Sequence, residues 1–178
     1  MPEPAAKGAE APGVRIAVLD PRAILLVLAA SKARDEAGAQ LTSLASQHGL
    51  SLRQAGPGRW LIVAIASDPA ALLGDVRQAL GGSASVLDQS DGQVAIGMTG
   101  GSVRATLAKG TAVDLNPESF RVDEAAPTLI GHIPAHLTRT GADDFEILVP
   151  RSYAASLWDS LGEMAAEFGY EAQPAAID

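Results

Sequence analysis

Two stretches of this chain that lie 85 residues apart carry the same succession of apolar and polar positions. Trp60 corresponds to Phe145, and the same spacing joins Ile62 to Ile147, Ser67 to Ser152, Leu72 to Leu157, Leu73 to Trp158 and Val76 to Leu161. Such self-similarity indicates that the fold uses one structural unit twice. We therefore expect a single α+β domain over residues 14–170, with a duplicated strand-rich unit in pseudo-repeats at about 14–81 and 83–170.

The first copy has a clear strand followed by a clear helix. The run Trp60 to Ile65 is almost wholly apolar, which is typical of a central strand buried on both faces. Ser67 or Asp68 can cap the helix that follows, and Pro69 suits its first position. Gly81 ends that helix, whose predicted buried stripe is Leu72, Leu73, Val76 and Leu80.

The second copy repeats this order. The stretch Phe145 to Val149 predicts a strand in which Phe145, Ile147 and Val149 share one face. Ser152 opens a final helix with apolar positions every three or four residues, at Tyr153, Leu157, Leu161, Met164 and Phe168. We expect residues 171–178 to fray.

Between the two copies lies the stretch Asp88 to Phe120. Alternation at Val94, Ile96 and Met98 predicts a half-buried strand. A turn through Gly100-Gly101-Ser102 follows, and Ser102 is a candidate N-cap for a short helix over Val103 to Lys109 that Gly110 ends. Two further strands, at Leu129 to Ile133 and Ala135 to Thr138, are separated by Pro134, which is compatible with a bulge, a sheet edge or a strand end.

The N-terminal part begins with residues 1–13, MPEPAAKGAEAPG, which predict a disordered tail and do not have the pattern of a signal peptide. Val14 to Leu19 and Ala23 to Leu28 predict two strands around the turn Asp20-Pro21-Arg22. Asp35 to His48 is helical by its apolar spacing, and Gly49 ends it.

Composition excludes several classes of function. The chain has 13 Lys and Arg against 21 Asp and Glu, and its net charge of −8 disfavours nucleic acid and anionic membrane surfaces. It has no cysteine, so disulfides and thiolate metal sites are excluded. The apolar run Ala23 to Ala30 is far shorter than the roughly 20 residues that a membrane helix needs. We expect a cytoplasmic protein.

His132 and His136 form an H-x-x-x-H pattern. The surroundings predict a strand, in which four residues span about 13 Å, too far for both rings to bind one metal ion. A bend at Pro134 would shorten this distance. We interpret the pair as ordinary half-exposed strand histidines.

Other polar clusters have an ordinary structural interpretation. Gly100-Gly101-Ser102 could hold a phosphate, but it matches no phosphate-binding motif, and we interpret it as a tight turn. Ser102 also lacks the G-x-S-x-G motif of a hydrolase nucleophile. Asp88 and Asp91 flank a turn, and Asp123-Glu124 reads as a solvated loop. We assign no catalytic, cofactor-binding or metal-binding residue on this chain.

Three strings identify a resemblance: SDGQVAIGMTG from Ser90, LAKGTAVDLNPESF from Leu107, and DDFEILVPRSYAASLWDSL from Asp143. In this order and spacing they resemble the gamma subunit of heterotetrameric sarcosine oxidase. The match covers the second half of the chain well and the first half in outline. Members of that family often have a cysteine where this chain has Thr111, a position that looks structural.

The resemblance implies a fold related to the folate-binding aminomethyltransferases, which are built from a duplicated unit. It also implies a non-catalytic gamma subunit of a flavoprotein oxidoreductase that demethylates sarcosine to glycine, with hydrogen peroxide and methylenetetrahydrofolate as further products. In the family, FAD, FMN, NAD, zinc and tetrahydrofolate belong to the alpha, beta and delta subunits. No cofactor is expected on this chain.

One alternative is a stand-alone folate-binding or aminomethyltransferase-like one-carbon module, for which Asp88, Asp91 and Asp114 offer carboxylates to a pterin ring. If the chain is instead a subunit, its role is a docking surface, most simply for alpha. Leu148, Trp158 and Ile130 lie beside predicted core positions and are candidates for that surface. Trp158 is the candidate anchor, unless it only widens the core face of its helix.

Overall fold

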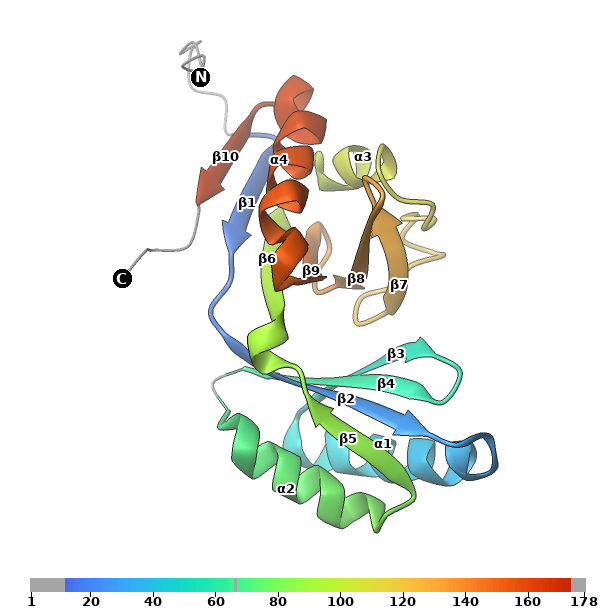
Figure 1. Ribbon diagram of the computed structural model, residues 1–178. Helices are drawn as coiled ribbons and strands as arrows, with labels where there is room; N and C mark the ends of the chain where they lie inside the picture. The colour runs from blue at the N-terminus through green and yellow to red at the C-terminus, as the bar shows by residue number, and fades with distance from the viewer. Residues whose placement is uncertain (1–11, 66, 174–178) are drawn as a thin grey trace.

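The computed structural model describes residues 12–65 and 67–173, and it contains two sheets that each carry helices on one face (Figure 1). The architecture is therefore α+β, as predicted. Residues 1–11 and 174–178, on which most of the predicted tail 1–13 and the end of the predicted fray fall, lie outside the described residues. Gly13, at the end of that tail, bonds to Phe168 and Ser102.

The first sheet is built from consecutive elements. In chain order these are β2 (Arg22–Ala29), α1 (Arg34–His48), β3 (Ser51–Gly56), β4 (Arg59–Ile65), α2 (Pro69–Leu80) and β5 (Ala84–Asp88). The strands are ordered β3-β4-β2-β5, and all neighbours are antiparallel. This is the β-α-β-β-α-β arrangement in which each helix connects two parallel strands that are not neighbours.

Local sequence signals account for the helices of this half. The Asp68 side chain accepts a hydrogen bond from the Ala70 N–H at 3.0 Å, so it caps α2 as predicted. Gly81 after α2 and Gly49 after α1 are both left-handed, with φ of 53° and 63°. A residue with a side chain would be strained in either position, so both helices end at their glycine.

The second sheet combines both ends of the described chain. Its elements are β1 (Val14–Val18), β6 (Gln93–Thr99), α3 (Val103–Ala108), β7 (Ala125–Ile130), β8 (Ile133–Arg139), β9 (Asp144–Pro150), α4 (Ala154–Ala165) and β10 (Tyr170–Gln173). The order is β10-β1-β6-β9-β8-β7, with β1 and β10 parallel and the other pairs antiparallel. Short 3-10 turns join elements at Ser31–Ala33 (η1), Ser90–Gly92 (η2), Arg151–Tyr153 (η3) and Ala166–Phe168 (η4).

The 85-residue spacing corresponds to matching elements. β4 and α2 occupy Arg59–Ile65 and Pro69–Leu80, and β9 and α4 occupy Asp144–Pro150 and Ala154–Ala165, which is the same pattern shifted by that spacing. Each strand lies inside its sheet and each helix covers the face of that sheet. The predicted central strand and the two predicted helices are confirmed.

Three strand expectations need correction, and two strands were missed. Pro134 does not separate two strands, because it lies inside β8 and the break between β7 and β8 falls at Gly131 and His132. β1 and β2 do not pair across the Asp20-Pro21-Arg22 turn; β1 pairs with β6 and β10, whereas β2 pairs with β4 and β5. Glu171–Gln173 do not fray, because they are bonded to β1 within β10. The strands β3 and β5 were not predicted, since Ser51–Gly56 and Ala84–Asp88 alternate weakly in hydrophobicity.

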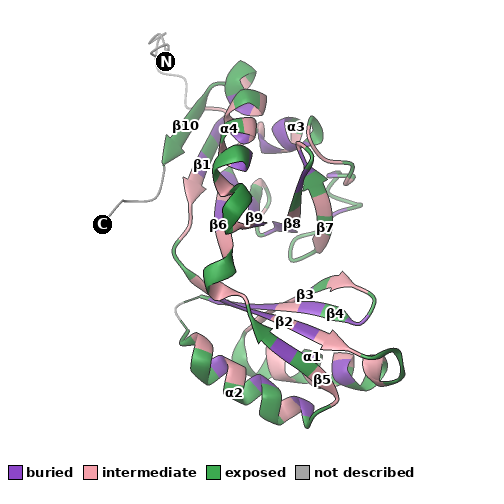
Figure 2. Ribbon diagram, in the orientation of Figure 1, coloured by how far each residue is buried: buried purple, intermediate pink, exposed green. Residues whose placement is uncertain are grey.

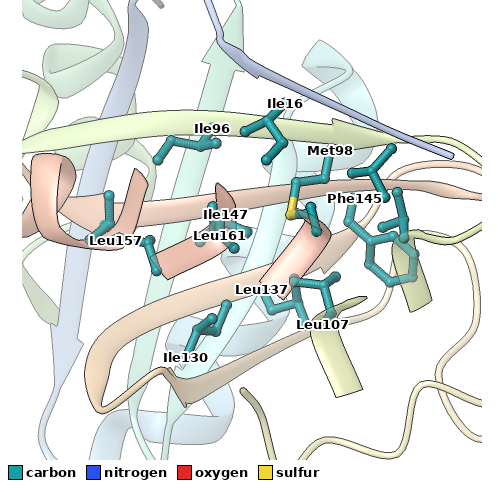
Figure 3. Packing of buried hydrophobic residues seen from close by; sticks show 14 of the residues in the cluster. Ile16, Ile96, Met98, Leu107, Ile130, Leu137, Phe145, Ile147, Leu157 and Leu161 are labelled. Atoms are coloured by element: carbon teal, nitrogen blue, oxygen red, sulfur yellow. The ribbon is translucent and has the colours of Figure 1, made fainter. Parts of the chain in front are cut away.

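Each half has its own core beneath its helices (Figure 2). The second core is the larger, and it joins strands β1, β6, β8 and β9 to helices α3 and α4, as the labelled side chains in Figure 3 show. Phe120, from the loop after α3, stacks on Phe145 with ring centroids 6.5 Å apart. The N-terminal strand is therefore part of the second core, through Val14 and Ile16.

Candidate functional site

The two sheets meet through the faces that their helices leave open. Ile24 and Val63 of the first sheet pack there against Ala95 and Leu148 of the second. Leu148 was expected to face a partner protein, and that expectation is wrong. The first half of the same chain covers it.

A charged cluster lies buried in this junction. The Glu146 carboxylate of β9 is 2.8 Å from Arg22 Nε and 2.7 Å from Arg53 Nη1, so it bridges two strands of the other sheet. Only 8% of the Arg22 side chain, 5% of Arg53 and 6% of Glu146 is exposed. Removing charges from water is costly unless they pair, and this pairing links the halves directly.

His136 of β8 lies at the same junction. Its Nε2 is 3.2 Å from the Gln54 carbonyl oxygen of β3, and the ring is buried. Burial lowers the pKa of His136 below its ordinary value, and the nearby Arg53 charge acts in the same direction. The bond to Gln54 and the Glu146 charge act in the opposite direction but do not outweigh burial, and the contact with Gln54 joins the two sheets.

His132 lies elsewhere, and the two histidines do not share a site. Gly131 and His132 form the β7–β8 turn with φ of 55° and 71°, which leaves the His132 side chain exposed. The prediction of two half-exposed strand histidines is thus wrong for both residues. Over residues 12–65 and 67–173 no group of three or more His, Asp or Glu side chains could hold a metal ion.

The Gly100-Gly101-Ser102 loop is a structural turn. The Gly100 N–H donates to the Asp143 carbonyl at 3.2 Å, and the Ser102 N–H donates to the Gly13 carbonyl at 3.0 Å. A side chain at Gly100 would collide with Gly13, since a Cβ atom would lie 2.5 Å from its carbonyl oxygen. The Gly100 N–H thus holds the residue before β9 and the Ser102 N–H holds the residue before β1, so neither is available to a phosphate.

Asp88 and Asp91 do not form a carboxylate pair with acid–base properties. Asp88 accepts hydrogen bonds from the Ser90 hydroxyl at 2.6 Å and the Ser90 N–H at 2.9 Å, and these bonds lower its pKa. Asp91 is exposed in η2, where its carbonyl accepts from Arg151 Nε at 2.7 Å. Both residues stabilise the passage from β5 to β6.

The other carboxylates named from the sequence also close turns. The pKa of Asp114 is lowered by a hydrogen bond from the Ser119 side chain and by the Asn116 N–H, which lies 3.0 Å from its Oδ1. Glu124 Oε2 accepts from the Arg121 N–H at 2.9 Å, beside Asp123 in a left-handed conformation. These exposed groups lie on the connection from α3 to β7, where their hydrogen bonds are local.

The other two residues that were expected to face a partner, Trp158 and Ile130, differ in their burial. Trp158 is half-buried and packs against the second core, while Ile130 is fully buried within it, so the expectation for Ile130 is wrong. Its neighbour Leu129 is 54% exposed, on the opposite face of β7. Thr111 is structural as expected, because its hydroxyl lies 2.8 Å from that of Thr128 and ties a loop to β7.

The sequence analysis overlooked the buried charges, although a signal was present. Glu146 occupies an inward position in a strand that is otherwise apolar, and Arg53 lies in a stretch that resembled a loop. A carboxylate in a central strand is almost never fully buried without a partner. That rule would have predicted a buried cation opposite Glu146 without naming which one.

The fold and these contacts define the class to which this protein belongs. It is an α+β protein of two facing sheets, in which Gly100, Ser102, Asp88, Asp114 and His136 bond to other parts of the same chain. Among the described residues, no helix is long and apolar enough to cross a membrane.

Comparison with known proteins defines the family. A model described as "Sarcosine oxidase, gamma subunit family" matches residues 22–167, so the chain belongs to the sarcosine oxidase gamma subunit family. The resemblance that the three strings indicated is confirmed.

Individual relatives agree with this assignment. A sarcosine oxidase subunit gamma of Arthrobacter sp. is 34% identical over 55% of this chain and 47% of the relative. The subunit gamma of Corynebacterium sp. strain P-1 is 32% identical over 68% of this chain and 62% of the relative. The aligned region thus spans about half to three-fifths of these relatives.

Solved structures share the fold. A chain of heterotetrameric sarcosine oxidase from Corynebacterium sp. U-96 matches with a TM-score of 0.75 and 24% identity, over 96% of this chain and 90% of that one. The aminomethyltransferase T of the glycine cleavage system from Bartonella henselae matches with a TM-score of 0.59 and 14% identity, over 91% of this chain and 48% of that one. The predicted relation to the aminomethyltransferase fold is confirmed.

Proposed function

We propose that this chain is the gamma subunit of a heterotetrameric sarcosine oxidase and has a structural role in that complex. The observation that carries the proposal is the family match over residues 22–167, which includes most of both halves. The likeness to a chain of a heterotetrameric sarcosine oxidase supports it, since that likeness also extends over both sheets.

In this proposal the complex oxidises sarcosine with oxygen, gives glycine and hydrogen peroxide, and passes the one-carbon unit to tetrahydrofolate. FAD, FMN, NAD, zinc and tetrahydrofolate belong to the alpha, beta and delta subunits. The contacts of this chain fit such a division, because the polar groups that could have served a cofactor stabilise turns or the junction.

Co-expression tests the proposal. The chain, carrying an affinity tag, is produced together with the alpha, beta and delta subunits and purified through the tag. We expect all four subunits in the eluate, with sarcosine-dependent formation of hydrogen peroxide. Recovery of the tagged chain alone, together with full oxidase activity in a complex that lacks it, would contradict the proposal.

Trp158 remains the proposed anchor for docking. Trp158 is half-buried and packs on the second core beside the buried face of α4, so part of its surface is available to a partner. We expect Trp158→Ala to keep its circular dichroism spectrum and to co-purify poorly with the other subunits. Tyr153→Ala, at an exposed aromatic residue just before α4, is the matched control. Loss of folded structure in Trp158→Ala would instead assign the ring to the core.

A second candidate, a stand-alone folate-binding one-carbon module, is favoured by one observation. The fold matches an aminomethyltransferase, although over only 48% of that chain. Asp88, Asp91 and Asp114, which this candidate needs for a pterin, are exposed residues of local turns. Calorimetric titration of the isolated chain with tetrahydrofolate separates the candidates, because micromolar binding would favour the module.

A further inference from the structure

A cavity of about 630 Å³ opens where the chain passes between the sheets. Two connections run beside each other there, from β1 to β2 and from β5 to β6 (Figure 1). Hydrogen bonds from the Leu19 N–H to Ala95 and from the Gln89 N–H to Ile24 hold them in place. The lining is apolar in part, and Arg22 contributes a charge to it.

Arg22 is buried and only partly used by the protein. Its Nε donates to Glu146 at 2.8 Å, and 8% of its side chain is exposed. Within the described part of the chain, its two terminal nitrogens have no acceptor. A guanidinium presents these nitrogens as a fork that matches the two oxygens of a carboxylate.

The net charge of the buried cluster also favours an anion beside Arg22. Arg22 and Arg53 share the single carboxylate of Glu146, which leaves one positive charge in excess. Arg53 Nε donates to the Ser51 hydroxyl, a neutral group that does not balance this charge. A buried charge without a counterion is costly, and Arg22 is the member of the cluster that lines the cavity.

We propose that this cavity binds a carboxylate group on the free fork of Arg22. The site goes beyond the proposed function, which gives this chain no ligand. Asp20, Asp91 and Arg151 also line the cavity, and all three are exposed. With Arg22 the lining thus carries two positive and two negative charges, a balance that favours a monocarboxylate over the more highly charged sulfate or phosphate. The carboxylate comes from a small molecule or from an acidic side chain of a partner subunit.

Titration of the full chain with sodium acetate tests the site. Thermal unfolding is followed while acetate replaces chloride at constant ionic strength, and we expect a saturable rise in Tm that sulfate does not match. Arg22→Gln should raise the apparent Kd for acetate roughly tenfold or more, because charge-assisted hydrogen bonds are lost. Arg15→Gln, at an exposed arginine outside the cavity, is the control and should titrate as the parent chain does.

A second variant keeps the test decisive if Arg22→Gln does not fold. Ser67 is an exposed residue of the cavity lining, so Ser67→Trp should obstruct the cavity while the Arg22–Glu146 pair is retained. Loss of the acetate response in this variant supports the site. An absent response in the parent chain, or an equal response in the parent chain and both variants, overturns it.

The same titration on the purified complex separates the two sources of the carboxylate. If a partner's acidic side chain fills the site, the complex no longer responds to acetate although the isolated chain does. If the ligand is a small molecule, the complex keeps the response. The measurement on the isolated chain does not depend on the proposed function, so the two claims can fail separately.

Discussion

The two halves of this chain use similar elements in a similar order, yet only the first is continuous in sequence. The first sheet is formed by residues 22–88 alone, whereas the second takes β1 from the N-terminal side and β6 to β10 from the C-terminal side. The first helix of the first half has 15 residues, and its counterpart α3 has 6. The halves are thus most alike where the 85-residue spacing holds, in β4–α2 and β9–α4.

This difference shows how the halves are joined. β1 lies between β6 and β10 in the second sheet. The second sheet therefore needs residues 14–18, which precede the first half in the sequence, to be complete. The chain passes between the sheets twice, and the Arg22–Glu146–Arg53 cluster connects them across the same junction. We therefore expect the halves to unfold together.

The largest expected effect comes from the buried charges. Glu146→Ala removes the carboxylate that two guanidinium groups share, and losing one partner of a buried ion pair typically costs about 3–5 kcal/mol. Urea denaturation measures the change in the free energy of unfolding. Glu163→Ala, at an exposed position of α4, should stay within about 0.5 kcal/mol of the parent. A similarly small change for Glu146→Ala would show that the cluster does not hold the halves together.

The sequence predicted elements whose causes are local. Asp68, Pro69 and Gly81 marked both ends of α2 within the helix's immediate surroundings, and the apolar run from Trp60 marked β4. The strand β3 was missed because its buried residue Arg53 is paired with Glu146, far away in sequence. The strands that pair with β1 and the residues that cover Leu148 are also distant in sequence, so the local sequence could not predict them.

The candidate site likewise combines features that have local causes with features that depend on distant segments. The sequence correctly described Gly100-Gly101-Ser102 as a turn, because a local bond from the Val103 N–H to the Gly100 carbonyl closes it, whereas the predicted side-chain cap of Ser102 is not formed. The cavity beside Arg22 is formed by segments that the fold brings together from positions around 20, 67, 91 and 151, and no local pattern joins them. Its prediction needs the topology, in particular the two crossings between the sheets.

Corresponding leucines of α2 and α4 give the next largest effect and compare the two cores directly. Leu157 is 0% exposed in the larger core, and its counterpart Leu72 is 8% exposed in the smaller one. We expect Leu157→Ala to lower the free energy of unfolding by roughly 3–5 kcal/mol and Leu72→Ala by roughly 2–3 kcal/mol. Urea denaturation of both variants is the measurement, and the reverse order would contradict the ranking of the cores.

The two N-cap positions give the smallest effect. Asp68→Ala removes the bond to the Ala70 N–H and should cost about 1 kcal/mol. Ser102 occupies the corresponding position of α3 but makes no side-chain cap bond, so Ser102→Ala should cost less than about 0.5 kcal/mol. Shifts in Tm measure both. An equal loss of stability in both variants would contradict the expected difference between the two N-cap residues.

One measurement tests most directly whether the halves form a single folding unit. The chain has two tryptophans, Trp60 in β4 of the first half and Trp158 in α4 of the second, so each half carries its own fluorescent probe. Urea unfolding is followed in Trp60→Phe, which reports on the second half, and in Trp158→Phe, which reports on the first. Each is compared with far-UV circular dichroism of the same variant. A single unit predicts that fluorescence and circular dichroism give the same midpoint within each variant. A separate fluorescence transition for either half would contradict the account.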